Sequence, residues 1–216
     1  GLLADSALIA HGRGEAFDYL LGERTIPSAG RAAIESVNRL AAAYNPVISL
    51  NGNSTVLAGR DAVKLAALIG CKIEINIFYR TDSRITLLSQ ALDLIKIEAA
   101  SESPVDDIPP EVWSQQVAEV EILGENPDTQ IPGLEGPRAK CCSQGIYAAD
   151  VVLVPLEDGD RCEALIEMGK QVLVVDLNPL SRTARTANVT IVDNVSRAFE
   201  GMVRNAAEHS SAPNPM

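Results

Sequence analysis

The chain has 216 residues, of which 46% are hydrophobic and 4% aromatic, and its formal net charge at pH 7 is −11. A chain of this length buries roughly 70–75% of its unfolded surface in one core, so folding needs neither a disulfide nor a structural metal. The negative charge argues against nucleic acid or an anionic membrane as a partner. No run of about 18 apolar residues exists that could span a membrane. We expect one domain over residues 1–209.

The cysteines indicate the compartment. Cys71, Cys141, Cys142 and Cys162 form no CxxC pair, and the adjacent pair does not match the spacing of a zinc site. We interpret all four as buried, reduced thiols. The first ten residues lack the basic start and the cleavage site of a signal peptide. The expected location is therefore the cytoplasm.

Strand-length runs of β-branched residues alternate with Ala- and Leu-rich stretches of helical spacing. In chain order, the predicted elements are a helix at 27–44, a strand at 46–50, a helix at 59–69, a strand at 72–78, a helix at 83–100, a strand at 117–123, a helix at 137–148, a strand at 150–154, a helix at 160–169, strands at 171–175 and 189–192, and a helix at 194–209. Gly70 and Gly169 fall where helices should end. The alternation predicts an α/β fold, with a doubly wound, mostly parallel sheet of about six strands and helices on both faces. We expect the Rossmann-like strand order 3-2-1-4-5-6.

Two segments do not follow this alternation. Residues 101–111 are acidic and contain three prolines, which predicts a surface loop inserted into the domain. Residues 210–216 are expected to form a disordered tail.

Polar residues follow nearly every predicted strand. Asn51, Gly52 and Asn53 follow the first strand, Arg80 and Arg84 follow the second, and the last three strands run into residues 157–161, 176–182 and 193–194. Ligands of open parallel sheets bind beyond the carboxyl ends of the strands, where the strand order reverses. With the expected order, residues 51–53 and 157–161 face each other across one crevice.

The chemistry of these residues favours a polyanionic ligand. Arginine offers a planar fork to phosphate or carboxylate oxygens, and each charge-assisted bond contributes about 1.5–3 kcal/mol in a sheltered site. Asp158, Asp160, Asp176 and Asp193 could hold Mg²⁺ or ribose hydroxyls, or could pair with the arginines. The alternative interpretation is a set of structural ion pairs.

No single motif here is specific. The sequence contains neither GxGxxG after a strand nor a P-loop. Asn51–Gly52–Asn53 also fits an ordinary turn, and 157–161 fits a helix start capped by Asp158. Residues 11–15 (HGRGE) form either a flexible turn with a base, a cation and an acid, or a loop that caps a helix starting near Glu15.

Longer blocks, taken together, carry more information than these short motifs. HGRGEAFDYLLGERT (11–25), PVISLNGN (46–53), EINIFYRTDSR (74–84), IPGLE (131–135), GIYAADVVLVPLEDGDRCEAL (145–165), DLNPLSRTAR (176–185) and TIVDN (190–194) run in order across nearly the whole chain. The sequence resembles the archaeal 4-phosphopantoate–β-alanine ligases, also called phosphopantothenate synthetases. The resemblance implies a Mg²⁺-dependent homodimer with a Rossmann-like core.

The resemblance also implies a reaction of coenzyme A biosynthesis. ATP and 4-phosphopantoate give an acyl-adenylate and pyrophosphate, and β-alanine then gives 4-phosphopantothenate and AMP. Attack of a carboxylate on the α-phosphorus requires alignment more than a protein nucleophile, and no nucleophile–base motif is present. A nucleotide-binding module without catalysis and a different carboxylate–amine ligase on the same scaffold remain the alternatives.

Residue roles follow from the same resemblance. It implies that Arg13, Arg80 and Arg84 hold the phosphate and carboxylate of 4-phosphopantoate, and that Asn51, Gly52 and Asn53 let the ligand approach the backbone. His11 or Glu15 would accept the ammonium proton of β-alanine, so the catalytic candidates are His11, Arg13, Glu15 and Arg80. The nucleotide would be lined by Asp158, Gly159, Asp160, Arg161, Asp176, Asn178, Leu180, Ser181, Arg182, Asp193 and Asn194. The sequence assigns no metal ligands.

Overall fold

Six parallel strands form the central sheet of the computed structural model, which describes residues 1–103 and 108–211 apart from the side chains at positions 8, 10–13 and 209–211. The strands are β1 (Pro46–Leu50), β2 (Lys72–Ile75), β3 (Ile122–Leu123), β6 (Val151–Pro155), β7 (Gln171–Val175) and β8 (Val189–Ile191). They lie in the order β3-β2-β1-β6-β7-β8, with every neighbouring pair parallel. The predicted fold class, a doubly wound α/β sheet, is confirmed.

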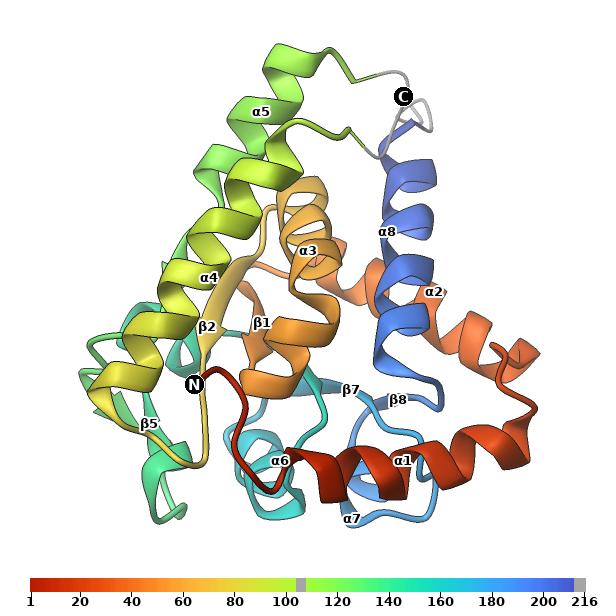
Figure 1. Ribbon diagram of the computed structural model, residues 1–216, viewed down its shortest axis with the longest axis vertical. Helices are drawn as coiled ribbons and strands as arrows, with labels where there is room; N and C mark the ends of the chain where they lie inside the picture. The colour runs from red at the N-terminus through yellow and green to blue at the C-terminus, as the bar shows by residue number, and fades with distance from the viewer. Residues whose placement is uncertain (104–107, 212–216) are drawn as a thin grey trace.

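Alternate residues of the central strands face two separate cores. On β1, Ile48 joins one core and Val47 the other, and β6 and β7 alternate in the same way. The larger core lies under α2 (Pro27–Ala42), α3 (Gly52–Ile69), α4 (Asp82–Ala100), α5 (Pro110–Glu119) and α8 (Val195–Ser211). The smaller core lies under α6 (Gly159–Glu167), near the short helix α7 (Arg182–Thr186) (Figure 1). Burial on both faces explains why these strands are predominantly apolar.

The strand order, with strands numbered along the chain, differs in detail from the predicted 3-2-1-4-5-6. The reason is that two short strands outside this sheet lie between β3 and β6 in the chain. These are β4 (Thr129–Gln130) and β5 (Lys140–Cys141), which pair antiparallel in a sheet of their own. The helix predicted at 137–148 is wrong. That segment contains a 3₁₀ turn, η1 (Pro137–Ala139), then β5, then a π-helical turn, η2 (Ser143–Tyr147), with non-helical backbone at Gly145. The backbone N–H groups of Cys142 and Ile146 donate to the carboxylate of Glu74 on β2 (2.9 and 2.6 Å) instead of to carbonyls within the segment.

Several predicted boundaries shift by a few residues. Helix α3 begins at Gly52 rather than at 59, so the turn predicted at 51–53 is a capped helix start. Much of the strand predicted at 117–123 belongs to α5 or to the connection after it, and only Ile122–Leu123 pairs with β2. Gly70 and Gly169 have φ of 82° and 80°, which confirms that helices end there. Helix α8 includes residues 210 and 211, so the tail prediction is wrong for those two. Positions 212–216, and 104–107 of the acidic loop, lie outside the described residues.

Helix α1 (Ala7–Leu21) starts well before Glu15, where the sequence had left a helix start open as an alternative, and it contains the whole of the turn predicted at 11–15. Glycine lowers helix stability by about 1 kcal/mol, so two glycines made a turn the better local prediction. Tertiary contacts override that preference, including an ion pair of Asp18 with Arg197 on α8.

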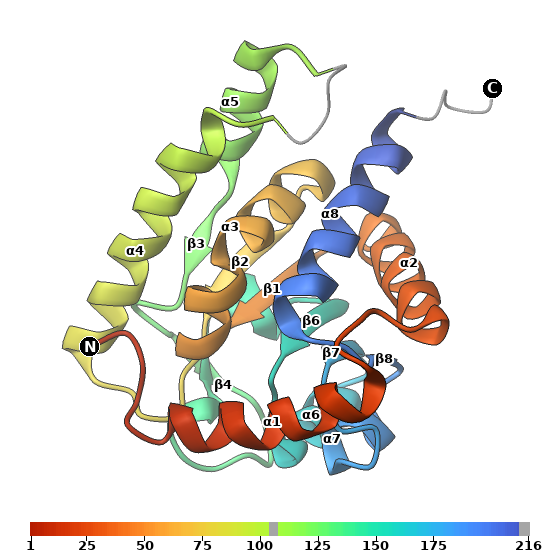
Figure 2. The ribbon, with the colours of Figure 1, turned by 45° about the vertical axis from the view of Figure 1, so that its right-hand side comes forward.

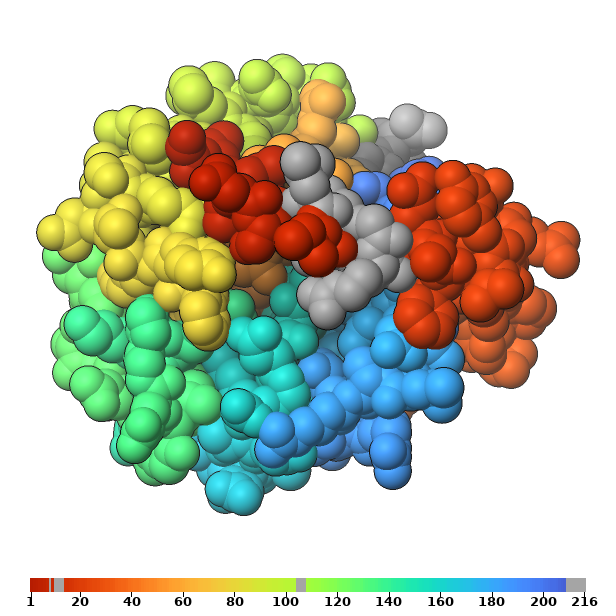
Figure 3. Space-filling model, turned by 60° about the horizontal axis from the view of Figure 1, so that its bottom comes forward, coloured from red at the N-terminus to blue at the C-terminus, as the bar shows by residue number. Residues whose placement is uncertain are grey.

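Helix α1 runs across the end of the molecule toward which the strands point (Figure 2). A Cβ atom on Gly14 would lie 3.4 Å from Leu177, in the loop after β7. Seen from this end, the amino-terminal segment lies between the loop after β2 and the loops after β6 and β7 (Figure 3). Among the residues that the structure describes, no helix is both long and apolar enough to cross a bilayer.

Candidate functional site

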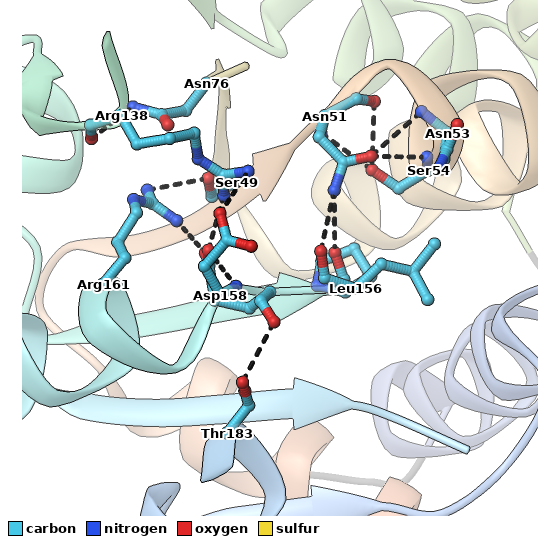
Figure 4. Close-up of polar contacts among 12 residues, drawn as sticks. Ser49, Asn51, Asn53, Ser54, Asn76, Arg138, Leu156, Asp158, Arg161 and Thr183 are labelled. Atoms are coloured by element: carbon cyan, nitrogen blue, oxygen red, sulfur yellow. Dashed lines mark hydrogen bonds and ion pairs between the residues drawn. The ribbon is translucent and has the colours of Figure 1, made fainter. Parts of the chain in front are cut away.

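The site begins where the strand order reverses, between β1 and β6. Asn51 ends β1 and caps α3, with its Oδ1 accepting hydrogen bonds from the backbone N–H groups of Asn53 (2.9 Å) and Ser54 (3.1 Å). Its Nδ2 donates to the carbonyls of Pro155 (3.2 Å) and Leu156 (3.0 Å) at the end of β6. Figure 4 shows this side chain between the two strand ends. The prediction that the first and fourth strands of the sheet are neighbours where the strand order reverses is confirmed, because β1 pairs with β6 and these hydrogen bonds join their ends.

The other end of the β1–β6 pair is also held by hydrogen bonds. Asp150, just before β6, accepts hydrogen bonds from the backbone N–H groups of Tyr44 (2.8 Å) and Asn45 (2.9 Å), just before β1. Both ends of this central pair are therefore joined by side chains as well as by the strand ladder.

Beyond β6 the backbone turns sharply. Leu156 has a φ of 57°, in the left-handed region that residues other than glycine rarely adopt. Its N–H donates to the carbonyl of Val175 (3.1 Å), and its own carbonyl accepts from Asn51. These bonds hold the strained conformation in place, and strained backbone of this kind concentrates at functional sites.

After this turn, the carboxylate of Glu157 is buried between two arginines. Its Oε1 accepts hydrogen bonds from Arg138 Nη2 (2.6 Å) and from the N–H of Asp158 (2.7 Å), while Oε2 pairs with Arg161 Nη1. Burial disfavours the charge, but the guanidinium groups of Arg138 and Arg161 outweigh burial and hold the pKa of Glu157 below its ordinary value. The Glu157 carboxylate is therefore ionised at neutral pH and pairs with both arginines.

Arg161 is the more deeply buried of the two arginines. Its side chain is 1% exposed, and Nη2 donates to Ser49 Oγ of β1 at 3.1 Å. Figure 4 shows Arg138 and Arg161 reaching from different elements toward Ser49. Arg161, predicted to line the nucleotide, is thus enclosed within the protein.

Sequence reasoning missed Arg138, which follows no strand of the main sheet. Its position depends on Asn76, one residue beyond β2, whose Nδ2 donates to the carbonyls of Arg138 (3.3 Å) and Lys140 (2.9 Å). The buried Nε atoms of Arg138 and Arg161 and the buried Oδ1 of Asn76 have no hydrogen-bond partner among the described residues. The sequence carried no local signal for this role, because residues 137–148 were predicted as a helix and not as part of the site.

Two of the three arginines predicted to bind 4-phosphopantoate, Arg80 and Arg84, contact backbone carbonyls. Arg80 Nη2 donates to the carbonyls of Gly124 (2.6 Å) and Glu125 (3.0 Å), beyond β3. Arg84 donates to the carbonyls of Tyr79, Gly1 and Leu2. A Cβ atom on Gly52 would lie 2.6 Å from the Leu2 carbonyl, so only glycine fits under the amino-terminal segment here.

The loop after β7 is organised by its own side chains. Asp176 accepts hydrogen bonds from the Asn178 N–H (2.9 Å) and the Ser181 hydroxyl, and Asn178 Oδ1 accepts from the Leu180 N–H (2.9 Å). Ser181 then caps α7 through the Ala184 N–H. These side chains preform a compact turn beside β7, in which Leu180 is 76% exposed.

Arg182 lies on the surface and pairs with Asp160 and Glu163 of α6. A Cβ atom on Gly159 would approach three carbons of the Arg182 side chain to 2.8–2.9 Å, so glycine is required for this contact. The structure thus brings three of the residues predicted to bind nucleotide, Gly159, Asp160 and Arg182, together at the start of α6.

Asp193 and Asn194 lie at the other end of the predicted nucleotide site. Asp193 is 1% exposed and accepts hydrogen bonds from Thr25 Oγ1 and from Arg197 Nε (3.0 Å) and Nη2 (2.8 Å), while Asn194 Oδ1 accepts from the Ser196 N–H (3.0 Å). Asp193 borders a cavity of about 350 Å³ between α2 and α8. A second cavity, of about 290 Å³, lies beside Gly124 and Cys142 at the end of β3. Both cavities lie away from the β1–β6 junction.

The remaining catalytic candidates are on α1. Glu15 is exposed and accepts a hydrogen bond from the Tyr19 hydroxyl at 2.9 Å. The side chains of His11 and Arg13 lie outside the described residues. No cluster of three or more His, Cys, Asp or Glu side chains that could hold a metal is found in the described part of the chain. All four cysteines are buried free thiols, and burial raises the pKa of the Cys142 thiol to about 11.

Fold and site together define a doubly wound α/β protein whose charged residues converge at the carboxyl ends of its strands. A sequence profile described as phosphopantothenate/pantothenate synthetase matches residues 28–215. The chain is 50% identical to a 4-phosphopantoate–β-alanine ligase of Thermococcus kodakarensis and 48% identical to one of Thermococcus onnurineus, in each case over 96% of this chain and 72% of the relative. It is 47% identical to a ligase of the same name from Methanosarcina mazei, over 96% and 73%. The chain belongs to the phosphopantothenate/pantothenate synthetase family.

Proposed function

We propose that this chain is an ATP-dependent ligase that joins 4-phosphopantoate to β-alanine, giving 4-phosphopantothenate for coenzyme A biosynthesis. The observation that carries this proposal is the identity of 47–50%, over 96% of the chain, to three ligases named for that reaction. The described geometry supports it, because cationic side chains and strained backbone gather where ligands of doubly wound sheets bind.

The proposed route has two steps. The carboxylate of 4-phosphopantoate attacks the α-phosphorus of ATP, forming an acyl-adenylate and releasing pyrophosphate. The β-alanine amine then attacks the acyl carbon and releases AMP. Neither step needs a nucleophilic side chain, which is consistent with four buried thiols and with the raised pKa of Cys142. The work of the protein is alignment and the stabilisation of negative charge.

We assign the nucleotide to the ends of β6, β7 and β8, where Asp160 and Arg182 are exposed beside Gly159 and the 176–181 turn is preformed. The acid substrate is assigned to the neighbouring side, toward Arg80 and the start of α3. His11 and Glu15 on α1 remain our candidates for accepting the ammonium proton of β-alanine, and Arg13 on the same helix remains a candidate for holding 4-phosphopantoate. Asn51 serves mainly to hold the strand ends, because its amide already makes four hydrogen bonds within the protein.

Mg²⁺ fits this arrangement. The ion is usually held by one or two carboxylates together with phosphate oxygens and water. Asp160 would hold it, since its side chain is 70% exposed at the start of α6. Bound Mg²⁺ would neutralise charge on the phosphates. A homodimer in the cytoplasm completes the proposal, and reduced thiols suit that compartment.

The test is an assay of purified protein with ATP, Mg²⁺, 4-phosphopantoate and β-alanine. We expect pyrophosphate release to depend on 4-phosphopantoate, and AMP formation to accompany 4-phosphopantothenate. A nucleotide-binding module would bind ATP without releasing pyrophosphate. A different ligase would release no additional pyrophosphate when 4-phosphopantoate is added. Either result would reject the proposal.

Two arginine variants test the assignment of 4-phosphopantoate and ATP to different sides of the site. Arg80→Ala should raise KM for 4-phosphopantoate about 10- to 150-fold with a smaller effect on ATP, since one sheltered charge-assisted contact contributes about 1.5–3 kcal/mol. Arg182→Ala should act mainly on ATP. If both variants are folded and affect both substrates equally, the assignment of the two substrates to different sides of the site is wrong.

A further inference from the structure

The amino-terminal end of α6 lacks the side-chain cap that its sequence offers. Asp158 stands at the N-cap position, but its carboxylate accepts no hydrogen bond from the first turn. The first backbone N–H groups of a helix point outward with a partial positive charge, so an uncapped start favours an anion. A helix start alone does not make a binding site, so the neighbouring side chains decide the matter.

A buried guanidinium lies beside this helix start. Arg138 is 8% exposed, and only its Nη2 is firmly paired, with Glu157 at 2.6 Å. Its Nη1 lies 3.6 Å from Asp158 Oδ2, and its buried Nε has no partner among the described residues. Buried polar atoms are nearly always hydrogen-bonded in folded proteins, and an exception points to a missing partner.

Asp158 occupies the place beside Arg138 where the oxyanion of a ligand could bind. Its carboxylate is an oxyanion beside Arg138, yet its side chain is 57% exposed and free to turn away into water. Arg161 cannot take the same role, because its side chain is 1% exposed and is held by Glu157 and Ser49. Arg138 is therefore the guanidinium of this buried pair that a ligand can reach.

We propose that Arg138, together with the uncapped start of α6, binds phosphoryl oxygens of a substrate, and that the ligand displaces the Asp158 carboxylate. Two residues position Arg138 for this contact. Glu157 accepts a hydrogen bond from the Arg138 guanidinium, and Asn76 donates one to the Arg138 backbone carbonyl. The inference rests on the proposed function only for the identity of the phosphorylated ligands, which are ATP and 4-phosphopantoate.

The test measures binding rather than turnover. Dissociation constants for ATP with Mg²⁺ and for 4-phosphopantoate are measured separately by calorimetry, on wild type, Arg138→Lys and Asp158→Asn. Lysine keeps the charge beside Glu157 but lacks the fork, so it can pair with Glu157 or the ligand but not with both. We expect Arg138→Lys to weaken one of the two ligands about tenfold or more. Asp158→Asn should tighten that same ligand, and its identity tells which phosphoryl group binds here.

The control is Arg39→Lys on α2, where the arginine pairs with Glu35 on the surface. Thermal unfolding of each variant establishes that it is folded. The proposal is overturned if folded Arg138→Lys binds both ligands within about twofold of wild type. It is also overturned if Asp158→Asn weakens the ligand that Arg138→Lys weakens, because Asp158 would then assist binding rather than compete. Binding that depends on Arg138 in a protein without ligase turnover would reject the proposed function and leave this inference standing.

Discussion

Replacing Glu157 by glutamine should destabilise the protein far more than the loss of one hydrogen bond. The change keeps the shape of the side chain but removes the charge that two buried guanidinium groups share. Removing one partner of a buried ion pair costs about 3–5 kcal/mol, because the remaining charge is left uncompensated. Two arginines are affected here, so we expect at least the upper part of that range. That is a large fraction of a typical folding free energy.

The same carboxylate gives a dependence on pH with a definite sign. The pKa of Glu157 is lowered in the folded protein, so the unfolded chain takes up the proton first as the pH falls. The contribution of Glu157 is therefore fully present above the ordinary pKa of a glutamate, about 4.3, and is lost as the pH falls through the lowered value. The difference in unfolding free energy between wild type and Glu157→Gln should shrink in that acid range.

The measurement is urea unfolding of both proteins from neutral pH down to the acid limit of solubility. Glu163→Gln is the matched control, because Glu163 also pairs with an arginine, Arg182, but on the surface. Exposed pairs contribute little to stability. If the two glutamine variants unfold at the same urea concentration at neutral pH, the buried pair does not stabilise the fold as argued.

Three further predictions concern the surroundings of the site. Gly124→Ala should yield little folded protein, because φ is 111° and a Cβ atom would lie 2.3 Å from the Ile75 carbonyl; soluble yield and circular dichroism measure this. Asn51→Ala should lower the unfolding free energy by about 2–4 kcal/mol in urea, from one lost helix cap and two further hydrogen bonds, and a loss below about 1 kcal/mol would refute the account. Replacing all four cysteines by alanine or serine should leave turnover largely intact and cost about 1 kcal/mol of stability per site, whereas inactivation of a folded single variant would contradict a mechanism without a thiol nucleophile.

The central sheet was predictable because its strands are buried on both faces. Residues 171–175 form β7 with the predicted bounds, since a continuous β-branched run between glycine and an aspartate admits few alternatives. The helix predicted at 137–148 failed because its backbone hydrogen bonds are not local. Residues 142 and 146 donate to the buried carboxylate of Glu74 on β2 (2.9 and 2.6 Å), a partner far away in the sequence.

The adjacency of the strand ends was predicted, whereas the surroundings of individual side chains were not. The convergence of the first and fourth strand ends followed from the strand order, and the hydrogen bonds of Asn51 confirm it. Arg138 was not found, because its place depends on Asn76, and no local pattern records a contact between residues so far apart. The burial of Arg161 was likewise invisible, since an exposed and an enclosed arginine look the same in a sequence.

The two side chains that join β1 to β6 have a consequence for motion. The sheet divides into the halves β3-β2-β1 and β6-β7-β8, which meet at this central pair. Here Asn51 fixes one end of the central pair and Asp150 fixes the other, so the halves cannot swing apart without breaking both sets of hydrogen bonds. Any opening that admits substrate must therefore come from the elements that cover the strand ends, and α1 is the largest of these.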